Sequence, residues 1–352
     1  MLLNKILSVI IPIYNGGDYI IKLIDSIRLQ NPDIINDIEI ILVNDGSNDN
    51  SEKICLELRK LYSNIIYLKK ENGGIASARN FGLEFASGQF ITFCDQDDVV
   101  IKGYSYFLEL IGDADFLISN SSKKEDGKTF FNENVKMRES CDRSKIETLA
   151  TYMLTYGALE RKSDLQNPVK DFSSIWNCIF KREFIKENGI RFEQIIDYED
   201  DWRFVTQSLV FAKKIVLTPE CYYKWTVNQK SESHTHKYIS NYFEKRQKHI
   251  EWIAGCLRIM NFSKDEILKY KNAPHIVCSG TIWGFYNACC LNYRGFKKEM
   301  KYIEDNRELI SSASKKLQNV PFITNFFLIL LCNRLESVAY FINKYIIKKY
   351  YH

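Results

Sequence analysis

Residues 90–98 decide the fold and have the sequence FITFCDQDD. Four of the first five residues are apolar, β-branched or aromatic, which predicts a strand buried on both faces. Three carboxylates follow at Asp95, Asp97 and Asp98. Such closely spaced carboxylates repel one another unless a cation lies among them, and their hard oxygens suit Mg²⁺ or Mn²⁺. The alternative is a simple turn in which Asp97 or Asp98 caps a helix from about residue 101.

The residues before this stretch alternate between strand and helix patterns. Apolar runs at 6–11, 38–43, 65–68 and 90–94 are separated by helical patterns near 18–30, 50–62 and 74–87. This rhythm predicts an α/β fold with a mostly parallel sheet and helices on both faces. The carboxyl ends of such strands form one ligand-binding edge. Residues 120–145 are polar and predict an exposed turn or loop, whereas the chain after about residue 235 is helical nearly throughout.

Composition narrows the class of protein. The chain has 352 residues, is 45% apolar and 26% charged, and carries a net charge of +4, which suits a folded protein and argues against nucleic acid as partner. Its ten cysteines are scattered without a CxxC pair. Since the N-terminus shows no secretory signal and no apolar run reaches the length of a bilayer, we expect a cytoplasmic protein with reduced thiols.

Polar residues follow the first two strands at the predicted ligand edge. Pro12 is expected to end the first strand ladder, because it lacks an N–H group, and to leave Tyr14 and Asn15 facing a ligand. A Tyr14 ring can stack on a base, and Asp45 after the second strand can accept the N3–H of a uracil. The alternatives are core packing for Tyr14 and turn chemistry for Asp45. Neither a GxGxxG fingerprint nor a P-loop is present.

The third strand leads into a glycine-rich connection that contains Asn72 and Gly73. Paired glycines let the backbone approach a ligand closely, and Arg79 in the helix that follows can pair with a carboxylate or a diphosphate. Small residues in this helix also suit close packing on the sheet, which we favour for Ala76 and Ala78.

Four motifs now stand in order along the first 120 residues: IPIYN at 11–15, VNDGS at 43–47, NGG at 72–74 with ARN at 78–80, and DQDD at 95–98. Together they resemble the N-terminal half of a family 2 glycosyltransferase with the GT-A fold. The resemblance implies a nucleotide-sugar site, with the base near Tyr14 and Asp45 and a divalent metal on the diphosphate. It makes Asp97 the principal metal ligand and Asp95 the residue that holds ribose or metal-bound water. The implied donor-binding residues are Pro12, Tyr14, Asn15, Asp45, Asn72, Gly73, Arg79, Asp95, Gln96 and Asp97.

A second acidic cluster, DYED at 197–200 followed by Asp201, resembles the ED motif of the same family. Displacement at an anomeric carbon with inversion requires a carboxylate that takes the proton of the acceptor hydroxyl. We predict Asp200 as this base, Glu199 as its neighbour that positions the acceptor or the base, and Asp201 as the alternative base. Acids in a first helical turn also stabilise the helix without any catalysis. We expect this cluster and the first one to meet across one cleft.

Two flanking segments carry further candidates. Trp176 lies before the second acidic cluster and suits the core as well as a sugar platform. After the cluster, relatives carry a loop over the donor, and there Lys230 or Ser233 can reach the diphosphate and His234 can be a third metal ligand. Polar loops usually leave histidines such as His234 and His236 in solvent.

The C-terminal residues predict an amphipathic helix. Leu331, Leu335, Val338, Ile342 and Ile346 recur at helical spacing, and lysines and tyrosines gather near the end. This stripe suits packing on a core or partner helix and, equally, a position on an anionic membrane surface.

These observations predict an inverting, Mn²⁺- or Mg²⁺-dependent glycosyltransferase. It would take a sugar from a nucleoside diphosphate sugar, with a UDP-sugar as the favoured donor, to a hydroxyl of a saccharide or lipid-linked saccharide acceptor. The enzyme would act in capsule or lipopolysaccharide synthesis, in the cytoplasm or at the inner face of the membrane. We expect residues 1–120 to bind the donor, 121–234 the acceptor, and 235–352 to form a helical region. The alternatives are a sugar nucleotidyltransferase, which would need a basic glycine-rich loop after the first strand, and a catalytically silent sugar-nucleotide-binding partner protein.

Overall fold

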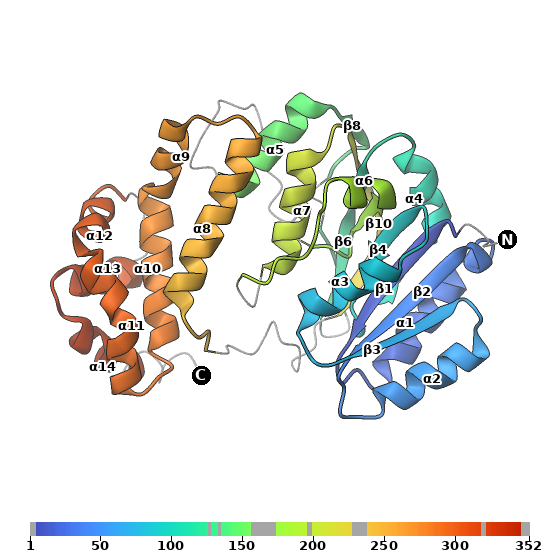
Figure 1. Cartoon of the computed structure of the whole chain (residues 1–352), viewed down its shortest axis with the longest axis horizontal. Helices are drawn as coiled ribbons and strands as arrows, with labels where there is room; N and C mark the ends of the chain where they lie inside the picture. Colours follow the sequence, from blue (N-terminus) through green and yellow to red (C-terminus); the bar gives the residue numbers. More distant parts are fainter. Residues whose placement is uncertain are drawn as a thin grey trace. The chain divides into compact units, whose positions relative to one another are not determined.

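The computed structural model describes residues 5–125, 128–132, 135–155, 174–195, 199–226, 238–317 and 322–345. They fall into two compact units (Figure 1). The first, here called the sheet unit, takes its described residues from 1–150, 163–194 and 198–234. The second, the helical unit, takes them from 151–162, 195–197 and 235–352. The division into donor, acceptor and helical regions at residues 120 and 234 stays a prediction.

The first half of the sheet unit has the predicted alternation of strands and helices. In chain order its elements are β1 (Leu7–Ile13), α1 (Tyr19–Gln30), a short 3₁₀ helix (Ile35–Asp37), β2 (Ile38–Asp45), α2 (Ser51–Leu61), β3 (Ile65–Lys70), α3 (Ile75–Phe85) and β4 (Phe90–Phe93). The strands pair in parallel in the order β3-β2-β1-β4 (Figure 1). Their carboxyl ends therefore meet at one edge of the sheet, as the sequence predicted.

The second half extends the same sheet in the order β4-β9-β6-β10-β5. Its elements are β5 (Val99–Val100), α4 (Tyr104–Ile111), β6 (Phe116–Glu125), β7 (Lys128–Asn132), β8 (Glu139–Cys141), α5 (Arg143–Thr155), β9 (Cys178–Lys181), α6 (Arg182–Glu187), α7 (Asp200–Phe211) and β10 (Ile215–Thr226). Because β9 runs antiparallel to both β4 and β6, strands β6 and β10 point in the same direction as the first four. The carboxyl end of β10 thus lies at the same edge of the sheet as that of β4.

The polar segment after residue 120 differs from the exposed loop that its composition predicted. Strand β6 continues to Glu125 and forms an antiparallel hairpin with β7, from the Ser121–Asn132 pair to the Glu125–Lys128 pair. Its other edge pairs with β10 as far as Lys124. Backbone pairing on both edges satisfies the N–H and C=O groups here, so the strand forms without an apolar side-chain pattern.

Both faces of the central strands are buried, and each face uses alternate residues. Helix α1 packs on the face that carries residues such as Val9 and Ile11, in one apolar cluster. Helix α3 lies against the opposite face, where a Cβ atom added to Gly82 would come within 2.5 Å of Cγ2 of Ile10. The close approach of α3 to β1 therefore depends on a residue without a side chain, which explains the small residues of this helix.

The helical unit forms its own core. Its helices are α8 (Tyr242–Ile259), α9 (Lys264–Lys271), α10 (Pro274–Ala288), α11 (Tyr293–Asp305), α12 (Arg307–Ser314), α13 (Phe322–Cys332) and α14 (Glu336–Tyr345). Buried side chains of α8, α10, α11, α12, α13 and α14 form one apolar cluster. None of the helices in the described ranges combines the length and the apolar character that a membrane crossing requires. The ten cysteines, all within those ranges, are free thiols.

The predicted stripe from Leu331 onward is broken within the described residues, which do not include its last member, Ile346. Helix α13 ends at Cys332 and α14 begins at Glu336, and Arg334 between them has a left-handed backbone with φ 62°. Leu331 is fully buried, whereas Leu335 and Val338 are 42% and 45% exposed. Residues with a common helical spacing in the sequence therefore belong to two helices with different environments.

Candidate active site

The carboxyl ends of the parallel strands bring the predicted donor motifs to one edge of the sheet unit. Tyr14 and Asn15 follow β1, Asp45 ends β2, and Asp95 follows β4. Open α/β sheets bind ligands at this edge, near the point where the strand order reverses around β1. The sequence therefore placed these residues together correctly.

The connections after β1 and β4 are bound to each other through Gln96. Its Oε1 accepts a hydrogen bond from the Tyr14 backbone N at 3.0 Å, and its Nε2 donates to the Tyr14 carbonyl at 2.9 Å. Gly16 makes room for this side chain, because a Cβ atom there would lie 2.4 Å from Gln96 Oε1. Gln96 thus fixes the Tyr14 backbone, while the Tyr14 side chain is 42% exposed at the edge where a base could stack.

Asn15 occupies a strained turn that links β1 to β2. Its φ of 49° lies in the left-handed region, which asparagine tolerates better than most residues. Its backbone N donates to Ser47 Oγ at 3.1 Å, and its Oδ1 accepts from the Asn48 N at 2.8 Å. Two motifs far apart in the sequence are thereby held in register.

Pro12 does not end the strand as predicted, because β1 continues to Ile13 and Pro12 pairs in register with Val43. The carbonyl of Ile10 accepts from the Cys94 N, so Ile10 and, two residues on, Pro12 both direct their backbone groups toward the β4 side. The β1–β4 pairing ends at Ile10 and Phe93. The missing N–H of Pro12 therefore costs no ladder hydrogen bond.

Asp45 is buried at the end of β2 and holds the glycine-rich connection before α3. Its carboxylate accepts from the Gly73 N at 3.0 Å, from the Gly74 N at 2.8 Å and from Lys70 Nζ at 2.6 Å. Asn72 Nδ2 donates to the Asp45 carbonyl at 3.0 Å. Asp45, Asn72 and Gly73, which were predicted as separate donor contacts, thus form one preorganised cluster.

Arg79 joins the two acidic clusters. Its side chain is only 2% exposed, and its guanidinium donates to Asp95 Oδ1 at 2.8 Å and to Asp201 Oδ1 at 2.5 Å. Burial opposes the charge, but Asp201 and Asp95 outweigh it and raise the pKa of Arg79 further above its usual value. The guanidinium also lies 5.2 Å from the ring centroid of Phe192. Arg79, predicted as a partner of a carboxylate or a diphosphate, is thus engaged with two carboxylates.

The second cluster begins helix α7, as predicted. Asp200 is 8% exposed, and its Oδ1 accepts from Arg203 at 2.7 Å. Burial raises the pKa of Asp200 above its ordinary value, although Arg203 acts in the opposite direction. Glu199 precedes the helix with φ 69°, and its Oε2 lies 3.9 Å from Arg203 Nη1. Asp201 additionally accepts from the Ile175 N at 3.3 Å, so both of its oxygens have intrachain partners.

Asp98 has a structural role that the sequence did not reveal. It is 1% exposed, and its carboxyl accepts from Tyr223 Oη and from the Thr226 N, both at 2.7 Å. The same Tyr223 oxygen accepts from the Asp95 N at 2.8 Å. Burial raises the pKa of Asp98 to about 9. Asp98 and Tyr223 therefore fasten the end of β10 to the acidic turn after β4. The sequence indicated this role only by containing one more acid than a metal site needs.

The remaining candidates have different outcomes. Trp176 is half-buried and stacks on Tyr223 with ring centroids 4.8 Å apart, so it contributes to packing beside the site. Lys230, Ser233, His234, His236 and the first acid of the second cluster, Asp197, lie outside the described residues.

The chemistry of the first acidic cluster fits a divalent metal bound with its substrate. Asp95 and Asp97 are both partly exposed, and carboxylate oxygens are the ligands that Mg²⁺ and Mn²⁺ prefer. Within the described ranges, no group of three or more His, Cys, Asp or Glu side chains is arranged to hold a metal ion. When Mg²⁺ binds with nucleotides, protein carboxylates usually supply only part of its coordination shell and leave positions for phosphate and water oxygens.

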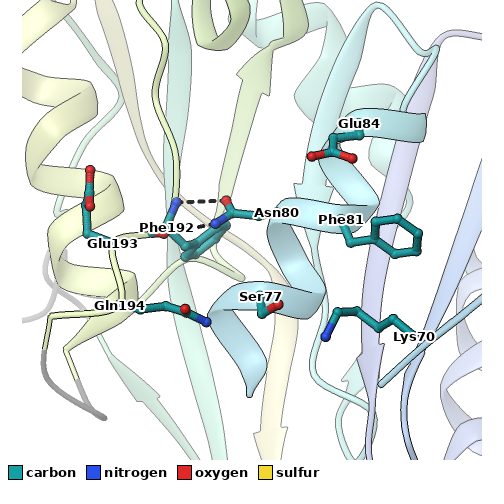
Figure 2. A pocket seen from close by; sticks show the side chains of 8 residues that line it. All are labelled: Lys70, Ser77, Asn80, Phe81, Glu84, Phe192, Glu193 and Gln194. Carbon is teal, nitrogen blue, oxygen red and sulfur yellow. Dashed lines mark hydrogen bonds between the residues drawn. The ribbon is translucent and has the colours of Figure 1, made fainter. Parts of the chain in front are cut away.

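A pocket of about 520 Å³ lies beside Lys70, the last residue of β3, and its lining contains none of the described acidic residues predicted for the site. It is lined by Lys70 and the outer face of α3, and by residues 192–194 (Figure 2). Asn80 is bound through its side-chain amide to both backbone groups of Phe192 at 2.9 Å, and Gln194 Nε2 donates to the Gly73 carbonyl at 3.0 Å. These bonds hold the segment that leads to the second acidic cluster against the helix that carries Arg79.

Comparison with known proteins agrees with this arrangement. The strand order, with β3-β2-β1-β4 parallel and β9 antiparallel, belongs to a structure with the GT-A fold. Residues 8–188 match the family described as Glycosyl transferase family 2, and the chain belongs to that family.

Several relatives of known name are similar in sequence. The chain is 50% identical over 101 residues, 28% of its length and 11% of the relative's, to the minor teichoic acid biosynthesis protein GgaB of Bacillus subtilis (strain 168). It is 27% identical over 262 residues, 72% of its length and 36% of the relative's, to the glycosyltransferase GlyA of Streptococcus pneumoniae serotype 4. The chain spans between 11% and 62% of the length of the first four curated relatives it matches.

The fold is also that of solved structures. S. aureus TarS 1-349, in a crystal structure with UDP-GlcNAc, superimposes with a TM-score of 0.63 at 17% sequence identity. The match covers 98% of this chain and 92% of that one. At this identity the similarity establishes the fold alone.

Proposed function

We propose that this chain carries out inverting, metal-dependent transfer of a sugar from a nucleoside diphosphate sugar to a hydroxyl of a saccharide or lipid-linked saccharide. The observation that carries the proposal is Arg79, which contacts Asp95 of the donor-side cluster and Asp201 of the acceptor-side cluster. A glycosyl transfer needs the leaving diphosphate and the attacking hydroxyl on opposite sides of one anomeric carbon. A single guanidinium that touches both acidic clusters supports a site in which the two reactants meet.

The donor is proposed to be a UDP-sugar. Tyr14 offers an exposed ring for stacking on a base. Asp45, predicted from the sequence to accept the N3–H of a uracil, already accepts through both carboxylate oxygens from Lys70, Gly73 and Gly74, so its proposed role is to shape the nucleoside site. Gly73 and Asn72 lie beside Asp45, so the backbone can approach the nucleoside closely. A protein of the same fold was solved with UDP-GlcNAc, which puts UDP-sugars first among the donors to test.

Asp95 and Asp97 are proposed to hold Mn²⁺ or Mg²⁺ with the donor, with His234 as the third ligand predicted from the sequence. When bound, the ion neutralises charge that develops on the departing diphosphate. Arg79 then has a separate task in this chain, because it holds Asp95 in place and balances its charge from the protein side.

Asp200 is the proposed general base, and Glu199 supports it at the start of α7. Asp201 uses both carboxylate oxygens within the protein, one with Arg79 and one with the Ile175 N. Asp200 is held by Arg203 through Oδ1. Its burial raises its pKa above that of an exposed aspartate, although Arg203 acts in the opposite direction, and so makes its carboxylate the stronger base.

The acceptor is proposed to be a growing cell-surface polymer, held by residues of the second half of the sheet unit. The sequence suggested capsule or lipopolysaccharide, and the name of GgaB adds teichoic acid to the polymers to be tested. A lipid-linked acceptor would place the enzyme at the inner face of the cytoplasmic membrane.

The decisive experiment is a screen of nucleotide sugars for Mn²⁺-dependent release of nucleoside diphosphate, with and without crude acceptor glycolipid. Asp97→Ala should lose both donor binding and turnover. Asp200→Asn should keep donor binding but lose turnover by roughly 10²- to 10⁴-fold, the usual contribution of a general base. Asp113→Asn, at a side chain that is 79% exposed, is the matched control and should behave as the wild type. Wild-type turnover in both site variants would refute the site.

The pH dependence of kcat/KM distinguishes Asp200 from Asp201 as the base. A base must be ionised, so the rate should fall as the pH drops through the pKa of Asp200, which lies above that of an ordinary aspartate. The fall in kcat/KM at low pH should be absent from the residual activity of Asp200→Asn and should remain in Asp201→Asn. The opposite result, in which the fall at low pH is lost in Asp201→Asn and kept in Asp200→Asn, would make Asp201 the base.

A further inference from the structure

The helical unit carries a row of exposed apolar side chains on two adjacent helices. Leu335, Val338 and Phe341, at the start of α14 and along it, are 42%, 45% and 48% exposed, and Tyr293 at the start of α11 is 37% exposed. We call these four residues the apolar row. Leu335 immediately precedes α14, and Val338 and Phe341 follow at steps of three residues, so each member lies beside the previous one on the surface of the helix.

Ring stacking and hydrogen bonds hold the side chains of the apolar row in place. The ring of Tyr293 stacks on Phe341 with centroids 5.6 Å apart, and its hydroxyl lies 2.6 Å from Ser337 Oγ. Tyr340, which is 2% exposed, donates its hydroxyl to the Leu291 carbonyl at 3.0 Å and fixes α14 against the end of α10 and the start of α11. The exposed side chains are therefore presented by a packed core.

Basic residues lie on the same elements as the apolar row. Arg294, Lys297, Lys298 and Lys301 lie along α11 and are all exposed, and Lys297 Nζ lies 5.5 Å from the ring centroid of Tyr293. Arg334, immediately before Leu335, is also exposed.

Nearby acids are engaged or distant. Glu336 is paired with Arg307 at 2.5 Å, and Glu299 accepts from Tyr238 Oη at 2.8 Å. Glu304 and Asp305 occupy the last turn of α11, roughly 16 Å from Tyr293 along the helix axis. Glu299 keeps its charge in its hydrogen bond with Tyr238, but residues 293–303 of α11 carry four exposed bases against this one acid, so the charge along this part of α11 is net positive.

We propose that the apolar row docks on an anionic lipid surface, with its side chains in the interface and the basic residues of α11 against lipid headgroups. An apolar stripe with aromatic residues and flanking cations is the chemistry of interfacial helices. A second copy of the chain fits less well, because two such faces would bring like charges together. Four side chains are also far fewer than the residues that a stable interface buries on each side. The inference rests on the proposed function, which includes a lipid-linked acceptor, and deepens it.

The test is co-sedimentation of the full chain with vesicles of phosphatidylcholine alone or mixed with phosphatidylglycerol. The wild type should bind the anionic vesicles, and added salt should weaken binding. Phe341→Asp combined with Val338→Asp should reduce binding at least tenfold. Leu268→Asp, at a side chain of α9 that is 57% exposed, is the matched control and should bind as the wild type.

The contribution of the basic residues is tested with the double variant Arg294→Gln and Lys297→Gln. Each basic residue near an anionic surface contributes roughly fivefold to binding, so the pair should lose about 25-fold. Lys264→Gln with Lys269→Gln, two exposed lysines of α9, should leave binding unchanged. Circular dichroism should show that all variants remain folded, with a lower melting temperature for the variant that contains Phe341→Asp, which loses the stacking of Phe341 on Tyr293.

Three results would overturn the proposal: no binding to anionic vesicles, equal binding to neutral ones, or equal losses in the α9 controls. Sedimentation equilibrium without lipid tests whether the apolar row binds a second copy of the chain. A dimer that is dissociated by Phe341→Asp would assign the row to self-association. Nucleotide-sugar turnover with a soluble acceptor is measured on the same variants. Intact turnover without vesicle binding would leave the proposed function standing and reject the lipid surface, whereas vesicle binding without turnover on any donor would do the reverse.

Discussion

Two sets of carboxylates at the same sheet edge are held in different ways. Asp45 is bound by two backbone N–H groups and by Lys70, all within residues 70–74. Asp95 and Asp201 lie 106 positions apart in the sequence and share a single guanidinium, that of Arg79. One carboxylate therefore has several donors from one short segment, whereas two carboxylates share one cation.

This difference determines how much each partner matters. Where several donors share one carboxylate, the loss of one leaves the others in place. Where one cation serves two partly buried carboxylates, its loss leaves two like charges close together without compensation. We therefore expect the Arg79 cluster to be the more sensitive part of the site, both for stability and for activity.

The largest effect is expected for Arg79→Met. Breaking a buried ion pair costs roughly 3–5 kcal/mol, and the lower end applies because the side chains of Asp95 and Asp201 are 28% and 26% exposed. Urea denaturation should show a loss of about 3 kcal/mol in the free energy of unfolding, and turnover should fall along with donor affinity.

The matched control for this variant is Arg59→Met, at an exposed arginine in the last turn of α2. It should change the free energy of unfolding by less than about 0.5 kcal/mol. The combination Arg79→Met with Asp201→Asn should recover part of the loss, because one uncompensated charge is removed. An unchanged stability in Arg79→Met would show that Arg79 does not hold the two clusters together.

The contrast also separates what the sequence could predict from what it could not. The Asp45 cluster follows from local rules, since a parallel β2–β3 pair places Asp45 beside the glycine-rich connection that follows β3. The partner of Arg79 could not be identified in this way. The sequence offered a carboxylate or a diphosphate, and the choice of Asp95 and Asp201 depends on how α7 packs, which no local pattern encodes.

Other differences have the same origin. The polar residues 121–125 form a strand because β7 and β10 pair with its backbone on both edges, which side-chain pattern does not reveal. Pro12 remains inside β1 because the neighbouring β1–β4 ladder has already ended. The stripe from Leu331 onward is divided at Arg334, a backbone feature that residue spacing alone cannot predict. Long-range pairing and packing decided each case.

A smaller effect is expected for Asp45→Asn. An amide presents an N–H₂ group to donors that now meet a carboxylate oxygen, either the Gly74 N or Lys70 Nζ. We expect a loss of about 1–2 kcal/mol in the free energy of unfolding and a raised KM for the donor, with kcat less affected. Lys70→Met removes only one of the local donors and should cost less than about 1 kcal/mol. A loss in Asp45→Asn that exceeds that of Arg79→Met would contradict the ranking of the two clusters.

The smallest effect is expected for Tyr223→Phe, which removes one hydroxyl and leaves the stacking of the ring on Trp176 intact. That hydroxyl donates to Asp98 and accepts from the Asp95 N, so its loss weakens the link between β10 and the acidic turn. Asp98 still accepts from the Thr226 N, which limits the expected cost to about 1 kcal/mol.

Tyr222→Phe on the same strand is the matched control, because the hydroxyl of this equally buried ring has only a 3.4 Å contact with Thr92 Oγ1. Equilibrium unfolding should separate the two variants, with the Tyr223 variant the less stable. If the Tyr223 variant instead matched Arg79→Met in both stability and turnover, the acidic turn would depend on Asp98 as much as on Arg79. The site would then have two long-range anchors, and the contrast with Asp45 would rest on distance along the chain rather than on the number of donors.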